Sequence, residues 1–171
     1  MGDVFKEQIV KRNPTGMDVI KRTGLILLVV IVFIACIGIP MLTPFTPIIT
    51  LAVGFGAFFL NGYLKVEYEY IFTNGELDID VIYNRSRRKR LFSTSVKSFE
   101  IMAHVDDMNH AGSFNRAHEI HDYSSGVKGP NTYAFLANYN NKQLKVIIEP
   151  NEKMMDAIKG SIPRSKLHLR V

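Results

Sequence analysis

The stretch "KVEYEYIFTNGELDIDVIY", Lys65 to Tyr83, contains the clearest structural signal in the chain. Apolar and polar residues alternate on both sides of Asn74-Gly75, a pair that type I′ turns favour because both central residues need a positive φ. A two-residue turn fixes the register, so the apolar residues of both runs share one face. These residues are Val66, Tyr68, Tyr70, Phe72, Leu77, Ile79, Val81 and Tyr83. The stretch therefore predicts a β-hairpin with one buried face.

Immediately before this hairpin, the chain carries no Asp, Glu, Lys, Arg or His from Gly24 to Leu64. Two apolar runs, residues 24–40 and 48–64, flank the segment "MLTPFTP", whose prolines cannot continue a helix. As a helix, each run is ~26 Å long and can cross a slightly thin bilayer. We therefore predict a transmembrane helical hairpin at residues 24–64. The alternatives are a buried helix pair in a soluble protein, a signal peptide, and a lipoprotein signal at Cys36.

The charges around the two runs predict the orientation of the hairpin. Five Lys/Arg residues precede the first run, Lys65 follows the second, and the loop between them has no charge. Because cytoplasmic flanks carry an excess of Lys and Arg, we expect a multi-pass protein of the cell membrane with both termini in the cytoplasm. Residues 1–23 are interpreted as a cytoplasmic segment, either a short amphipathic helix on the bilayer or an unstructured tail.

Small residues in the second apolar run can let another helix approach closely. Ala52 and Gly56 are four residues apart, with Gly54 between them, and this spacing is typical of close helix contacts in membranes. We expect the small face to pack against the first apolar run. The alternative partner is a second copy of the chain or another membrane protein.

After Tyr83 the sequence shows further strand patterns and one helix pattern, within a cytoplasmic β domain at residues 65–171. The later strands are expected at residues 89–93, 95–105, 118–123, 131–139 and 143–149, of which 118–123 is the weakest. Asn140-Asn141 is expected to form a second hairpin turn. A final helix is expected at about residues 150–160, with an apolar stripe made by Met154, Met155 and Ile158.

Seven antiparallel strands followed by one helix resemble the pleckstrin-homology (PH) architecture. More narrowly, the chain resembles an uncharacterised family of small bacterial two-span membrane proteins with a PH-like (bacterial pleckstrin-homology-like) domain. The resemblance lies in the order of the segments, which is two membrane spans, then the "FTNGEL" turn, an Arg-rich strand and the "SFE" segment. The resemblance covers about residues 24–165. It implies an α+β membrane protein, in which an N-terminal transmembrane helical hairpin precedes a PH-like antiparallel β-barrel or sandwich with a C-terminal helix. It implies no particular activity, because one fold can serve unrelated functions.

The sequence "RSRRKR", residues 85–90, is a dense cluster of positive charge. The second strand of the hairpin runs back towards the membrane, so the turn after it is expected on the membrane side. Cations there can contact anionic lipid headgroups, at roughly 1 kcal/mol each. The candidates are Arg85, Arg87, Arg88, Lys89 and Arg90. The alternative is that Arg88 and Arg90, on one strand face, form ordinary ion pairs with carboxylates of the preceding hairpin.

Motifs for catalysis or for a cofactor are not recognised in the sequence. Residues 104–122 contain His and acidic side chains that suit zinc, but not at the spacing of known metal motifs. These residues are His104, Asp106, Asp107, His110, His118, Glu119, His121 and Asp122. We predict neither an enzyme, nor a cofactor, nor a metal site, and a metal-dependent membrane enzyme using this region is the alternative.

The expected function is that of a membrane-anchored cytoplasmic interaction or scaffolding module, whose partner is the lipid bilayer. An accessory subunit of a larger membrane complex is the alternative. The net charge of +5 is small for a nucleic-acid binder, and no aromatic residues interleave the basic cluster, so no nucleic-acid partner is expected.

Overall fold

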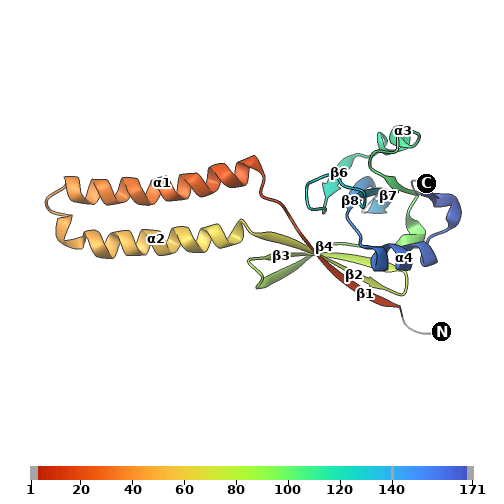
Figure 1. Ribbon diagram of the computed structural model, residues 1–171, viewed down its shortest axis with the longest axis horizontal. Helices are drawn as coiled ribbons and strands as arrows, with labels where there is room; N and C mark the ends of the chain where they lie inside the picture. The colour runs from red at the N-terminus through yellow and green to blue at the C-terminus, as the bar shows by residue number, and fades with distance from the viewer. Residues whose placement is uncertain (1–3, 140, 169–171) are drawn as a thin grey trace. The chain divides into compact units, whose positions relative to one another are not determined.

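The computed structural model describes residues 4–139 and 141–168, and these residues form two compact units (Figure 1). The helical unit comprises residues 14–66 and 83–86, and the β unit comprises the other described residues. Along the sequence, the chain therefore starts in the β unit, passes through the helical unit, and returns to the β unit. The short segment 83–86, between two strands, groups with the helices.

Two long apolar helices form most of the helical unit. Helix α1, Gly16–Gly38, begins with a capping box, in which the Asp18 backbone N–H donates to the Thr15 hydroxyl and the Asp18 carboxylate accepts from the Thr15 backbone. The 3₁₀ turn Thr43–Phe45 leads into helix α2, Thr46–Tyr63, which has a proline in its first turn. The two helices pack side by side as a hairpin (Figure 1), and this confirms the two predicted helices.

Both helices are long and apolar enough to be membrane spans. Only 6% of the most apolar window of each helix is buried, whereas a core helix of a soluble protein would have most of that window covered. The exposed side chains include Ile26, Leu27, Ile31, Leu51 and Phe58. This pattern favours candidate membrane spans over the alternative of a buried helix pair in a soluble protein.

The first sheet has the strand order β1-β2-β3-β4. Its strands are β1 (Phe5–Lys11), β2 (Val66–Thr73), β3 (Glu76–Tyr83) and β4 (Arg87–Ser95). The segment at residues 5–11 is a strand, and both interpretations given from the sequence, an amphipathic helix and an unstructured tail, are wrong for it. It pairs antiparallel with β2 along its whole length. The helical hairpin is thus an insertion between two neighbouring strands of one sheet.

The second sheet has the order β6-β8-β7-β5-β9. Its strands are β5 (Ile101–His104), β6 (Glu119–Asp122), β7 (Tyr133–Tyr139), β8 (Lys142–Ile148) and β9 (Leu167–His168). Pairs β5–β7 and β7–β8 are antiparallel, but β6–β8 and β5–β9 are parallel. The expectation of a wholly antiparallel domain of seven strands is therefore corrected to nine strands in the described residues, two of whose pairings are parallel.

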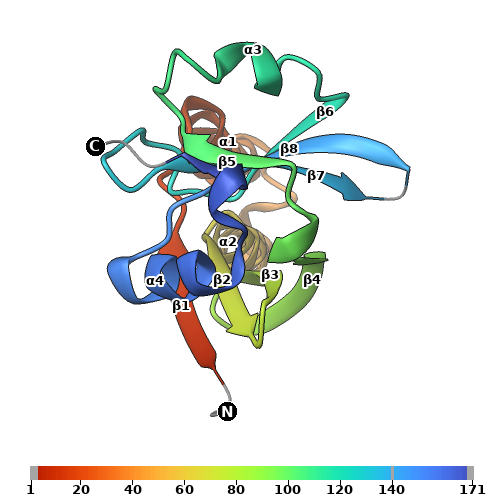
Figure 2. The same cartoon turned by 90° about the vertical axis from the view of Figure 1, so that its right-hand side faces the viewer.

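Four helical segments of the described residues complete the β unit. The 3₁₀ turn Val96–Ser98 replaces the first part of the strand expected at residues 95–105, and α3, Ala111–Phe114, is a single turn. Helix α4, Glu152–Ser161, is capped by Asn151, whose side chain accepts from the Met154 N–H. A further 3₁₀ turn, at residues 164–166, precedes β9. Helix α4 lies beside β1 (Figure 2) and confirms the predicted C-terminal helix.

The predicted apolar face of the β2–β3 hairpin lies in the core. Tyr70, Phe72, Leu77 and Ile79 have no exposed surface, and the ring of Phe99 stacks on that of Phe135 with the centroids 4.0 Å apart. The apolar stripe of α4 is also buried.

The two hairpin turns lie where the sequence predicts them, and their described residues have the positive φ that such turns need. Asn74 and Gly75 have φ of 51° and 93°, and Asn141 has φ of 62°, while Asn140 lies outside the described residues.

A single tyrosine hydroxyl connects three segments of the β unit. Tyr70 of β2 donates to the carbonyl oxygen of Tyr123 at 2.6 Å and accepts from the backbone N–H of Glu149 at 3.2 Å. Burial raises the pKa of Tyr70 well above its usual range, so this hydroxyl keeps its proton. It therefore ties β2 to the segments that follow β6 and β8.

Tyr70→Phe is expected to lower the free energy of unfolding of the β unit by about 1–3 kcal/mol, because it leaves a part-buried N–H and a buried carbonyl without a partner. Tyrosine near-UV circular dichroism of the full chain in detergent, titrated with urea, measures this loss, since the chain has seven Tyr and no Trp. Tyr133→Phe is the matched control and should change stability little. Equal effects of Tyr70→Phe and Tyr133→Phe would contradict a stabilising role for the two hydrogen bonds of the Tyr70 hydroxyl.

Candidate functional site

The turn between β3 and β4 is attached to the end of helix α2. Asn84 and Arg85 both have positive φ, 49° and 56°, and Asn is one of the residues that tolerate this conformation. The backbone N–H of Asn84 donates to the carbonyl oxygen of Lys65 at 3.0 Å. A Cβ on Gly62 would lie 3.0 Å from Cγ of Asn84. The glycine therefore permits the side chain of Asn84 to pack directly on the last turn of α2.

Arg88 and Arg90 of the basic cluster form ion pairs on the first sheet. Arg88 lies 3.1 Å from the buried carboxylate of Glu69. Arg90 lies 2.8 Å from Asp78 and also pairs with Asp80, and this hydrogen bond to Asp80 raises the pKa of Arg90. The alternative interpretation of the cluster, ion pairs with carboxylates of the preceding hairpin, is thus confirmed for these two arginines. The pair of Arg88 is not an ordinary surface pair, because the side chain of Glu69 is buried.

The other three cations, Arg85, Arg87 and Lys89, are exposed. Arg85 lies within the turn, Arg87 is the first residue of β4, and Lys89 follows on that strand. The exposed residue Lys65 begins the segment that leaves α2. The end of α2 and the turn that packs on it therefore carry exposed positive charge.

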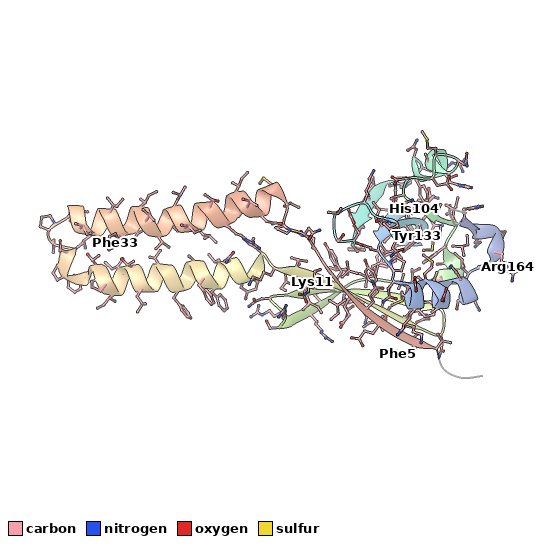
Figure 3. All side chains as sticks on the ribbon, viewed as in Figure 1. Phe5, Lys11, Phe33, His104, Tyr133 and Arg164 are labelled. Carbon is pink, nitrogen blue, oxygen red and sulfur yellow. The ribbon has the colours of Figure 1, made fainter. Side chains whose placement is uncertain are left out.

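The histidines and carboxylates of residues 104–122 belong to separate local networks. His104 is buried, and its Nδ1 accepts from the backbone N–H of Asp106 at 3.2 Å. Its Nε2 therefore carries the proton and donates to the carbonyl oxygen of Gly129 at 3.1 Å. The ring of His104 also lies edge-on to that of Tyr133, and Figure 3 labels both residues. Both of its nitrogens are satisfied, as in a structural core histidine.

The remaining members of this region pair with other neighbours. His110 Nδ1 lies 2.8 Å from Asp107, which lowers the pKa of that carboxyl, and its ring stacks on His168. His121 lies 2.8 Å from the Tyr123 hydroxyl. His118 is exposed, Glu119 pairs with Lys142, and Asp122 accepts from Ser124. Across residues 4–139 and 141–168, no three His, Cys, Asp or Glu side chains are placed to hold a metal ion.

The small residues of α2 do not mediate close packing on α1. A Cβ added to Gly54 or Gly56 would meet no atom within 4 Å, and Ala52 is exposed. The space over these residues is therefore open, and the expectation that α1 fills it is not supported. A second copy or another membrane protein on this face stays a prediction.

Three features of the candidate sites were not predicted from the sequence. The docking of Asn84 on Gly62 depends on a contact between segments distant in sequence, although Asn followed by a polar residue is itself a turn signal. The proximity of Glu7 to Glu69 requires the pairing of β1 with β2. Arg22 and Asn61 line one groove of the helical unit, and only the helix packing brings them together.

Comparison with known proteins agrees with the fold. The family model described as "Bacterial PH-like domain (DUF6106)" matches residues 2–167, a range that includes β1 and both long helices and ends at the first residue of β9. No curated protein and no solved structure matches the chain. The resemblance to a bacterial PH-like family is therefore confirmed over nearly the whole chain, and the chain belongs to the bacterial PH-like domain family DUF6106.

Proposed function

We propose that the chain is a membrane-anchored interaction module, whose PH-like domain contacts anionic lipid headgroups in the cytoplasmic leaflet through Arg85, Arg87 and Lys89. Residues 84–89, the turn after β3 and the start of β4, are called the basic turn. The observation that carries the proposal is the attachment of this turn to the end of α2, through the hydrogen bond from Asn84 to Lys65. When α1 and α2 span the bilayer, this end of α2 lies at the level of the headgroups.

Three observations support the membrane placement. The 41 residues from Gly24 to Leu64 carry no ionisable side chain apart from Cys36 and Tyr63. The apolar windows of both helices are almost entirely uncovered, and lipid would cover them. The Lys and Arg residues lie before the first apolar run and after the second, with none in the loop between, which supports a cytoplasmic location for both ends.

The basic turn supplies the exposed cations of the proposed contact. Arg88 and Arg90 pair with carboxylates of the first sheet, so the proposal does not depend on these two arginines. Arg85, Arg87 and Lys89 are exposed, and each cation close to an anionic surface contributes about 1 kcal/mol. Together they would favour the headgroup-bound position of the turn by up to about 3 kcal/mol, or on the order of a hundredfold.

The proposal is tested with the full chain in nanodiscs, after Cys36→Ser leaves Ser86→Cys as the single labelling site. An environment-sensitive fluorophore at this site should report a less polar surrounding in discs that contain phosphatidylglycerol than in discs of phosphatidylcholine alone. High salt should reverse the change, because it screens charges at a surface. The triple variant Arg85→Gln, Arg87→Gln, Lys89→Gln should lose the response.

A matched control removes the same number of positive charges elsewhere. Lys97, Lys153 and Arg164 are exposed and lie outside the basic turn, and their replacement by Gln should leave the fluorescence response intact. A response that ignores lipid charge, or one that persists in the variant of the turn, would contradict the proposed headgroup contact.

A further inference from the structure

A groove runs between the two long helices of the helical unit. It has a volume of about 390 Å³ and is lined on α1 by Arg22, Leu25 and Val29, and on α2 by Gly54, Phe58 and Asn61. A shallower apolar depression of about 700 Å³ shares Val29, Gly54 and Phe58 with it. This depression continues to Phe33 on α1 (Figure 3). The two hollows form one surface that is polar at one end and apolar along the rest.

The polar end of the groove contains hydrogen-bonding atoms that the described residues leave without a partner. Nε of Arg22 is a donor and Oδ1 of Asn61 is an acceptor, and both are buried. A polar atom without a partner is strongly unfavourable next to hydrocarbon. A ligand that accepts one hydrogen bond and donates another would satisfy both side chains.

The length of the groove matches one leaflet of a bilayer. At ~1.5 Å per helical residue, the distance from Arg22 to Phe33 is about 16 Å. Half of a hydrocarbon core of ~30 Å is about 15 Å. The apolar residues 24–64 start just after Arg22, so in a spanning hairpin Arg22 and Asn61 lie near the headgroups and the apolar part of the groove lies in the acyl region.

We infer that this groove binds one anionic glycerophospholipid with a hydroxyl-bearing headgroup, of the phosphatidylglycerol type. Its phosphate accepts from the guanidinium of Arg22, a headgroup hydroxyl donates to Asn61, and one acyl chain lies over Gly54 between Val29 and Phe58. The inference rests on the proposed placement of the helices in a membrane. It goes beyond the basic turn, because the lipid is held between the helices and not at the surface of the β unit.

The groove suits a lipid better than a third helix. An apolar helix in it would cover Arg22 without supplying an acceptor, and a buried cation without a partner is costly. The open space over Gly54, where a Cβ would meet no atom within 4 Å, is wide enough for an acyl chain in contact with the backbone. Charge and shape of the groove therefore agree on one amphipathic, anionic occupant.

Native mass spectrometry of the full chain in a mild detergent tests the inference. Delipidated protein is mixed with phosphatidylglycerol or phosphatidylcholine, and we expect one phosphatidylglycerol to be retained per chain in preference to phosphatidylcholine. Arg22→Gln should weaken retention about ten- to a hundredfold, the loss expected for a hydrogen bond to a charged group. Arg22→Lys, which keeps the charge without the forked donor, should fall between.

Two glycines of the same helix provide a matched pair of variants. Gly54→Leu places a side chain in the groove and should abolish retention. Gly56→Leu adds the same side chain to the same helix, also into open space, but Gly56 does not line the groove, so retention should persist. Since Leu is a better helix former than Gly, neither variant should disturb α2.

Retention of the two lipids to the same degree, or the same behaviour of Gly54→Leu and Gly56→Leu, would overturn the inference. The outcome is separable from the test of the basic turn. The variant Arg85→Gln, Arg87→Gln, Lys89→Gln should still retain one phosphatidylglycerol, and Gly54→Leu should still show the fluorescence response at position 86. A chain that loses only one of the two properties identifies which proposal has failed.

Discussion

Replacement of Phe5–Lys11 by a glycine–serine segment of equal length is expected to abolish the cooperative unfolding transition of the β unit. This segment is strand β1 and pairs with β2 from Phe5↔Thr73 to Lys11↔Glu67. Val10 is buried against the core, and the amide of Gln8 donates to Glu149 and accepts from the N–H of Asn151. Loss of β1 would also leave β2 as an unprotected edge strand.

The expected effect is large compared with the stability of an ordinary domain. Burial of Val10 contributes about 1.5–3 kcal/mol, and the two hydrogen bonds of Gln8 and those of the β1–β2 ladder contribute about 1 kcal/mol each. The sum reaches the 5–15 kcal/mol by which native domains are typically stable. Near-UV circular dichroism and protease resistance of the full chain in detergent measure the loss.

Neighbouring residues of β1 provide the control for this prediction. Val10 is 7% exposed and Ile9, on the opposite face, is 49% exposed. Val10→Asn should destabilise the β unit by about 2–4 kcal/mol, because it buries a polar group without a partner, whereas Ile9→Asn should cost about 1 kcal/mol or less. Unaltered unfolding after replacement of β1 would instead favour an N-terminal segment that is independent of the domain.

The sequence was informative where the structure depends on local pattern. Asn74-Gly75 and the alternation around it predicted the β2–β3 hairpin and its buried face, since a type I′ turn and a period of two residues leave one register. The absence of charge from Gly24 to Leu64 predicted two long apolar helices. The stripe at Met154, Met155 and Ile158 predicted α4. None of these features needs information from a distant segment.

The elements that were missed depend on distant partners. Phe5–Lys11 has Phe5 and Ile9 one helical turn apart, and only its pairing with β2, more than fifty residues away, selects a strand. Strand β9 has two residues and exists because it pairs with β5. The candidate site likewise depends in part on contacts between segments that are distant in sequence. Strand alternation placed Arg88 and Arg90 on one face, but the attachment of Asn84 to the end of α2 is visible only in the structure.

Arg88→Met is expected to lower the free energy of unfolding of the β unit by about 2–3 kcal/mol at neutral pH. The side chain of Glu69 has no exposed surface, and Arg88 is 3.1 Å from its carboxylate. Removal of one partner leaves a buried charge uncompensated, which typically costs about 3–5 kcal/mol. The lower figure applies here because the side chain of Arg88 is 61% exposed, so water screens part of the interaction. Lys89→Met, an exposed neighbour on the same strand, is the control and should change stability little.

The same substitution should change how stability depends on pH. Burial, followed by the hydrogen bond and charge of Glu7, raises the pKa of Glu69 above its usual value of 4.5, and Arg88 opposes this rise. A carboxyl with a raised pKa in the folded state costs stability as the pH rises from 4.5 through the folded pKa, because the unfolded chain ionises first. Without Arg88 the pKa rises further, so Arg88→Met should be closer to the parent protein at about pH 5 than at about pH 8.

Glu69→Gln separates this electrostatic cause from a loss of packing at Arg88. The amide cannot ionise, so Glu69→Gln with Arg88→Met should recover most of the lost stability at about pH 8 and should remove the pH dependence that Arg88→Met introduces. Urea unfolding of the four proteins at both pH values, followed by tyrosine circular dichroism, gives the coupling free energy of the pair directly. The contrary outcome is a loss of stability in Arg88→Met that is the same at both pH values and that Glu69→Gln does not relieve. It would show that Arg88 acts through the packing of its aliphatic stem, and that the charge of Glu69 is compensated elsewhere.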